Sequence, residues 1–257
     1  MMPARLVDCT VVRRTVRRSL ANGRRFDGRS LGDVRPVKVM CDVTPFAEGS
    51  AQAFIGMTHV IAGIRLEAAP PLADHPVEGV LRVHAGKDNA PLARAVERAI
   101  RDTEAVDLMR LCIEPGRTVW HVRLDVRCIN NDGSLIDACV LASVAALATA
   151  RMPRFDGGSV VRDERIGPLM VDGLPVTCTL GLVDGKLVAD LTREEGTVVE
   201  AKFCVTFQPD GALGQVIASG RNTLSPDKIS QAVELAKRAA PKLREGVLAA
   251  VARFKKA

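Results

Sequence analysis

Residues 135–151 read LIDACVLASVAALATAR, and Asp137 is the one charged residue before the closing arginine. The run falls short of the roughly 18 uninterrupted apolar residues that a membrane span needs. We therefore expect a helix inside a globular core. A helix that is apolar all round has to be covered all round, so the rest of the chain should wrap it.

Many of the remaining apolar segments look like strands. In residues 117–129, apolar and polar side chains approximately alternate, which is typical of a half-buried strand. β-branched residues and Gly or Pro boundaries favour antiparallel strands in a first set, residues 37–43, 50–57, 58–68 and 77–85. A second set follows at 175–183, 186–191, 198–207 and 213–219. Between the sets, residues 153–173 are expected to form a loop rich in glycine and charge.

One helix is predicted before the first strand set, and helices follow each set. An amphipathic basic helix is predicted over about 10–21 and another from near Ala90, while Ser225 caps a long C-terminal helix with an expected kink at Pro241. At the start of the apolar helix, Ser134 and Asp137 have the spacing of a helix cap. The chain thus reads as one α+β domain over 1–257, with pseudo-duplicated halves at about 24–153 and 174–257.

The charge of the chain is basic, at +6. Arginines gather near the N-terminus, where they suit either a polyanion partner or a solvated helix face. Aromatic residues make up only 3% of the chain, so any RNA contact should be arginine to phosphate and not base stacking. Seven cysteines without a C-x-x-C pair indicate reduced, buried thiols.

Enzyme and metal motifs do not stand out. The four histidines show no H-x-x-x-H pairing, and neither a P-loop nor G-x-S-x-G occurs. We therefore expect no metal and no cofactor, and the N-terminus lacks the apolar segment of a secretory signal.

Three stretches carry a family resemblance: RRFDGRSLGDVRPVKV at 24–39, the segment 92–153, and VADLTREEGTVVEAKFCVTFQPDG at 188–211. They resemble RNase PH-type subunits of the RNA exosome, and the similarity extends over about 24–254. The resemblance implies the RNase PH-like fold (ribosomal protein S5 domain 2-like). The middle stretch is most similar to the non-catalytic class of ring subunits.

The reaction of that family is phosphorolysis of RNA from its 3′ end. Active members carry two aspartates six residues apart, in an E-E-D then E-A-D pattern. The matching positions here are Gly196 and Lys202, and Arg221 stands in place of the serine of the phosphate loop. The resemblance therefore implies a degenerate active site, with catalytic residues lost at all three positions.

Binding is what the resemblance leaves to this chain. The motif L-A-R-x-x-x-R-x-x-R places RNA-contacting arginines at Arg94, Arg98 and Arg101, although pairing with Glu97, Asp102 or Glu104 would explain them too. The loop at 86–91 is shorter than in related subunits. Implied partners are sibling subunits in a hetero-oligomeric ring, RNA and RNA-binding cap subunits, and no membrane. The expected location is the cytoplasm for an archaeal-type ring, or the nucleus, nucleolus and cytoplasm for a eukaryotic one.

Two rival functions stay open. The chain could be an active phosphate-dependent 3′–5′ exoribonuclease with a displaced acid such as Asp190 or Glu194. It could also be a single-chain RNA-binding protein unrelated to a ring.

Overall fold

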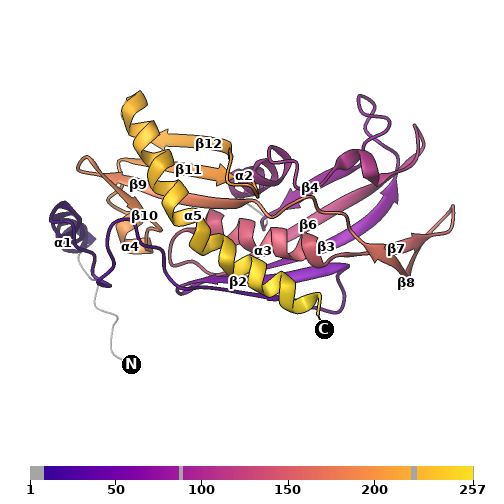
Figure 1. The fold of residues 1–257 in the computed structure, drawn as a ribbon, viewed down its shortest axis with the longest axis horizontal. Helices are drawn as coiled ribbons and strands as arrows, with labels where there is room; N and C mark the ends of the chain where they lie inside the picture. Colours follow the sequence, from indigo (N-terminus) through magenta and orange to yellow (C-terminus); the bar gives the residue numbers. More distant parts are fainter. Residues whose placement is uncertain (1–8, 87–88, 221–224, 257) are drawn as a thin grey trace.

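The apolar segment forms the helix at the centre of the fold. Helix α3, Leu135–Thr149, contacts strands of both main sheets in the computed structural model, which describes residues 9–86, 89–220 and 225–256 (Figure 1). Every residue from Ala138 to Leu147 is buried. The prediction of a helix wrapped on all sides is confirmed.

The first sheet has the strand order β1-β2-β3-β6-β4, and β5 pairs with β6. Its strands are β1 Val37–Cys41, β2 Gly49–Ile55, β3 Thr58–Ala69, β4 Val80–His84, β5 Cys112–Glu114 and β6 Thr118–Asn130. Strand β4 is parallel to β6, so the expectation of antiparallel strands is wrong for this one. Between the two the chain passes through helix α2, Ala90–Arg101, and the short helix η1, Leu108–Leu111. A crossover of that kind is what a parallel pair requires.

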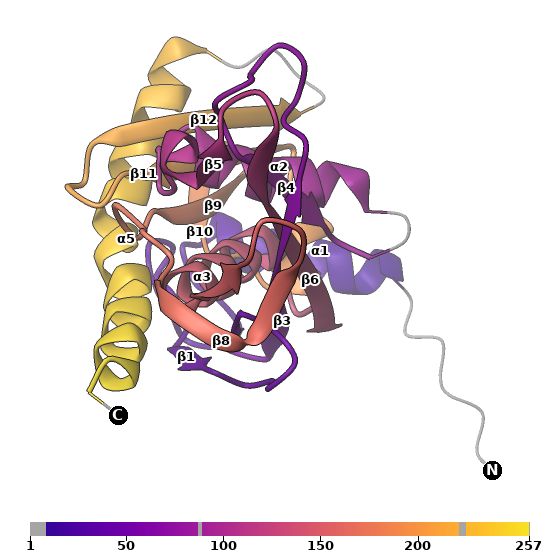
Figure 2. The ribbon, with the colours of Figure 1, turned by 90° about the vertical axis from the view of Figure 1, so that its right-hand side faces the viewer.

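The second sheet has the order β10-β9-β11-β12 and is antiparallel throughout. Its strands are β9 Val176–Val183, β10 Lys186–Ala189, β11 Ala201–Phe207 and β12 Leu213–Gly220. Helix α5, Pro226–Phe254, runs along the side of the molecule and contacts β1 of the first sheet as well as β9, β10 and β11 (Figure 2). Ser225 caps it as predicted, and the helix continues through Pro241.

The predicted loop at 153–173 is wrong over much of its length. Strands β7, Arg151–Phe155, and β8, Val160–Pro168, form a two-stranded hairpin at one end of the molecule (Figures 1 and 2). The Asp156 carboxylate closes its turn by accepting from the backbone N–H groups of Gly158 and Ser159. The middle of β8, residues 162–165, is a run of charged side chains, so the strand has no apolar alternation by which it would be predicted.

Helix α1, Cys9–Ala21, packs on the second sheet through one face only. Val16 and Leu20 are buried against a small apolar cluster of Val183, Val188, Leu191 and Val198. Arg17 on the outer face bridges Asp184 and Glu200, at 3.1 and 2.7 Å.

Two other expectations need correction. Cys128 is exposed, because β6 continues past the end of β4. Ser134 has φ of 47° and makes no side-chain cap bond; its hydroxyl donates to the Leu191 carbonyl at 3.4 Å. Across the described residues, none of the helices has the length and apolar character to cross a bilayer.

Candidate functional site

The acid-rich segment links β10 to β11 and folds as one short helical turn. Helix α4, Arg193–Gly196, begins at Thr192, whose hydroxyl accepts from the Glu195 backbone N–H while the Glu195 carboxylate accepts from the Thr192 N–H. This capping box satisfies donors that a helix start leaves free. The local sequence T-x-x-E therefore fixes where the acids of this segment point.

By the family resemblance, Gly196 and Lys202 match the two aspartates of the active pattern. Gly196 ends α4, and a Cβ built on it would meet no atom within 4 Å. Lys202 is exposed on β11, between Gly181 of β9 and Ser219 of β12. Neither position offers a carboxylate, and the described residues include no group of three His, Cys, Asp or Glu side chains suited to a metal. The side chains at these two positions therefore do not supply the ligands of a metal site. Arg221 lies outside the described residues.

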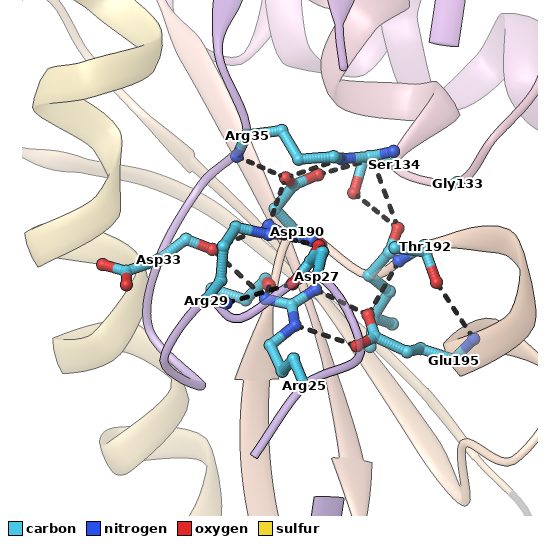
Figure 3. A network of polar contacts seen from close by, with 12 residues as sticks. Arg25, Asp27, Arg29, Asp33, Arg35, Gly133, Ser134, Asp190, Thr192 and Glu195 are labelled. Atoms are coloured by element: carbon cyan, nitrogen blue, oxygen red, sulfur yellow. Dashed lines mark hydrogen bonds and ion pairs between the residues drawn. The ribbon is translucent and has the colours of Figure 1, made fainter. Parts of the chain in front are cut away.

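Asp190 is an acid of the right type, but its oxygens are already bonded. It is buried, and Arg35 donates to both carboxylate oxygens, at 2.9 Å from Nε and 2.7 Å from Nη2. The Arg35 backbone N–H and the Arg29 guanidinium add contacts of 2.7 and 2.8 Å (Figure 3). Burial alone would raise the pKa of Asp190, yet the hydrogen bonds and charge of Arg35 hold it below its ordinary value. Asp190 is thus an ionised anchor for two arginines and not a free acid.

Glu195 is bonded in the same way. Arg25, whose side chain is fully buried, donates to its two oxygens at 2.8 and 2.5 Å. The remaining Arg25 donors reach the backbone carbonyls of Ala189 and Asp190, at 2.8 and 2.7 Å (Figure 3). Bidentate pairs of this kind are geometrically specific. Together the two pairs, Arg25–Glu195 and Arg35–Asp190, form a clamp that joins the segment before β1 to the segment after β10.

The clamp was not predicted from the sequence. In the sequence, Arg25 and Arg29 belong to the group of basic N-terminal residues expected on the surface. In the structure, Arg25 is buried and Arg29 is half-buried. Arginine is almost never fully buried unless paired, and the partners lie some 160 residues away along the chain. The resemblance of residues 24–39 to the family was the one signal that this stretch matters.

Asp137 is buried beneath the same region. Its oxygens accept from the Thr179 backbone N–H at 2.9 Å and from the Thr179 hydroxyl at 2.7 Å. Burial raises the pKa of Asp137 to about 8, against the lowering effect of those bonds. The helix-cap interpretation of Asp137 is wrong; the side chain ties α3 to β9.

The three candidate RNA-binding arginines lie on the exposed face of α2. Leu92, Val96 and Ile100 fill the opposite face and are buried. Among the described residues, the Arg94 guanidinium donates only to the backbone carbonyl of Ala90 in its own helix, at 3.4 Å. The Arg98 side chain has no hydrogen bond or ion pair with any residue in the described ranges.

Arg101 differs from the other two because it is paired. Its guanidinium lies 3.1 Å from the Glu97 carboxylate and 3.3 Å from the Leu81 carbonyl. The alternative of pairing within the helix therefore holds for Arg101, whereas Arg94 and Arg98 keep their charges available to a ligand.

Comparisons with known proteins agree on one family. Models of the 3′ exoribonuclease family match domain 1 at residues 33–153 and domain 2 at residues 173–239. The chain is 37% identical over 242 residues to the exosome complex component Rrp42 of Saccharolobus solfataricus, covering 87% of this chain and 88% of the relative.

Solved structures give the same result. An archaeal exosome core superposes with a TM-score of 0.86 at 34% identity, over 93% of this chain and 97% of that one. An Archaeoglobus fulgidus exosome with RNA bound to the active site gives 0.84 at 33% identity, over 92% and 98%.

Proposed function

This chain belongs to the 3′ exoribonuclease family, and we propose from that premise that it is an exosome ring subunit without a catalytic site of its own. The RNase PH-like fold predicted from the resemblance is confirmed. Its partners are sibling RNase PH-type subunits in a hetero-oligomeric ring that binds RNA.

The proposed loss of catalysis rests on one observation: the segment has no free carboxyl group at the positions where the active pattern has its aspartates. Phosphorolysis needs a carboxyl group free to protonate the leaving oxygen or to organise the attack. Here Gly196 and Lys202 lack one, and Asp190 and Glu195 are held by buried arginines. Lys202 also places a positive charge where an acid would stand. The chemistry therefore belongs to a sibling subunit.

One rival acid remains accessible. Glu194 is exposed on α4 and has no ion pair with the residues that the structure describes. The pure chain, incubated with oligo(A), phosphate and Mg²⁺, should release no ADP. Release of ADP that Glu194→Gln abolishes would reject the non-catalytic function. Asp190→Asn is the weaker probe, because removing one partner of a buried pair costs about 3–5 kcal/mol of stability and would abolish activity by unfolding.

The proposed contribution to RNA binding rests on Arg94 and Arg98. Both are exposed, and neither is bonded to an acid of the described chain. An unpaired guanidinium is free to contact a phosphate, whereas Arg101 would have to leave Glu97. We expect Arg94 and Arg98 to hold the RNA backbone beside the active site of the sibling.

The test uses the ring assembled with its sibling. Arg94→Ala together with Arg98→Ala should weaken oligo(A) binding and reduce the slope of log K against log salt by about 1.4, since each single-strand phosphate contact contributes about 0.7. Arg117→Ala is the matched control, because Arg117 is an exposed arginine paired with Glu114. Binding and slope that match those of the control would leave α2 with a structural role alone.

A further inference from the structure

The strand register of the first sheet brings three arginines side by side. Arg65 on β3 lies opposite Arg123 on β6, and Arg123 in turn lies beside Arg82 on β4. Their neighbours along each strand, such as Leu66 and Leu124, are buried in the core. Because side chains alternate between the faces of a strand, all three guanidinium groups project from the face that α3 does not cover. We call these residues the arginine row.

The arginine row has more positive charge than the chain neutralises. Glu67 lies 3.0 Å from Arg123 and 3.7 Å from Arg65. Arg82 has no ion pair with any residue in the described ranges, and the exposed Asp125 is likewise unpaired. Like charges directly opposite one another destabilise a sheet. The row therefore has a cost in the free chain that a bound anion would offset.

The row ends on β4, the strand that helix α2 contacts. Arg127, two strand positions beyond Asp125, is exposed, and its guanidinium lies 4.0 Å from where a Cβ on Gly86 would stand. Gly86 lies in the connection from β4 to α2. The basic surface thus extends from the row, past Arg127, toward the helix that carries Arg94 and Arg98.

We propose that the arginine row binds the phosphodiester backbone of RNA at a second site, beyond the contacts of α2. Neighbouring strands are about 4.8 Å apart, so the row presents guanidinium groups in a line. Arg82 is unpaired within the described ranges, while Arg65 and Arg123 share the single carboxylate of Glu67, so the row keeps donors for phosphate oxygens. No base-reading geometry is involved, and binding is independent of sequence. An acidic protein segment has similar charge, but RNA is already the ligand expected at the adjoining helix. The choice of RNA as the ligand rests on the proposed function.

The experiment uses the assembled ring, with the α2 arginines intact and Arg65→Ala and Arg82→Ala combined. Arg123 is kept, so that Glu67 retains its closer partner. Binding of long oligo(A) should weaken about tenfold, as expected for two exposed charge contacts, and a short oligo(A) that fills only the α2 contacts should bind as before. Melting of the RNA-free chain should shift to higher temperature, because the repulsion within the row is relieved. Arg117→Ala serves again as the control.

Each other outcome overturns the proposal in a recognisable way. If long oligo(A) binds the row variant normally while Arg94→Ala and Arg98→Ala weaken it, the row has no RNA site and the proposed function stands. If neither set of variants changes binding, both fail. If the row variant no longer assembles with the sibling, the row is a protein contact. Should the double variant not fold, Arg82→Gln alone repeats the test at the arginine without a partner.

Discussion

At the scale of single residues, Asp137 shows how burial sets the charge of a side chain. Its carboxyl group is enclosed between α3 and β9, and Thr179 supplies both of its hydrogen-bond donors. The pKa of about 8 means that the folded chain keeps this proton at neutral pH. The unfolded chain, with an ordinary aspartate pKa near 3.8, does not.

This difference predicts a pH dependence of stability. Between the two pKa values unfolding releases a proton, so the free energy of unfolding should fall as pH rises from about 4 to 8, with a slope of at most about 1.4 kcal/mol per pH unit. Asp137→Asn removes the titrating group while keeping an amide oxygen for Thr179. The free energy of unfolding of the variant, measured in urea, should therefore vary less with pH than that of wild type. At pH 8 the variant should be the more stable of the two.

The control is Asp125→Asn, an exposed aspartate without an ion pair in the described chain. Its pH profile should follow wild type. If Asp137→Asn followed wild type as well, the proton would be absent from the buried carboxyl group.

The burial and the partners of single side chains were the features that the sequence predicted least well. The exposed arginines of α2 followed from helical spacing, because the residues opposite them are apolar. The burial of Arg25 did not, because a side chain usually solvated becomes buried only through a carboxylate that is distant in sequence. Asp137 was misassigned for a related reason: its position near a helix start suits a cap, and only the fold brings Thr179 beside it.

At the scale of elements, α5 and β1 approach each other at Gly246. A Cβ built there would stand 2.6 Å from Cγ1 of Val37, which is a contact with a short, β-branched side chain. Gly246→Ala should therefore destabilise the chain by about 1–3 kcal/mol through overpacking, although alanine favours a helix over glycine by about 1 kcal/mol. Urea unfolding measures the difference.

The reference is Ala249→Gly in the same helix, where the side chain is exposed. It should cost about 1 kcal/mol by helix propensity alone. A Gly246→Ala variant more stable than wild type would mean that α5 can move away from β1 without loss.

Elements were the level that the sequence predicted best. β-branched residues and Gly or Pro boundaries located the strands of both main sheets except β5, and alternation located β6. Helical spacing located α1 and α2, and the long apolar run located α3. The pattern does not encode strand direction, so the parallel pairing of β4 was missed. Hairpin β7–β8 was missed because charged residues interrupt the apolar pattern of β8 and the two strands pair only with each other.

At the scale of the whole molecule, α3 joins the two halves of the chain. Strands β2 and β3 contact it from the first half, and β9 and α5 contact it from the second. Either half alone would leave apolar faces of this helix, or of its covering strands, in water. We expect residues 1–157 expressed alone to aggregate or to bind the dye ANS.

A cut in the intact chain should behave differently. The turn of the β7–β8 hairpin holds Gly157 and Gly158, both exposed and in open surroundings. After cleavage at a protease site inserted between them, the two fragments should elute together in size-exclusion chromatography until denaturant is added. Separation without denaturant would show that the halves fold independently. The domain limits and the pseudo-duplication inferred from the sequence remain predictions.

The clamp of Arg25, Arg35, Asp190 and Glu195 also affects how an enzymatic function is inferred from a sequence. A carboxylate that joins two segments through a buried ion pair supports the fold whether or not a polypeptide cuts RNA, because removing one partner leaves a buried charge unpaired. Surveys that infer a nuclease from an acid-rich stretch would count such chains as enzymes. The positions to inspect instead are Gly196 and Lys202, which hold no carboxylate and take no part in the clamp.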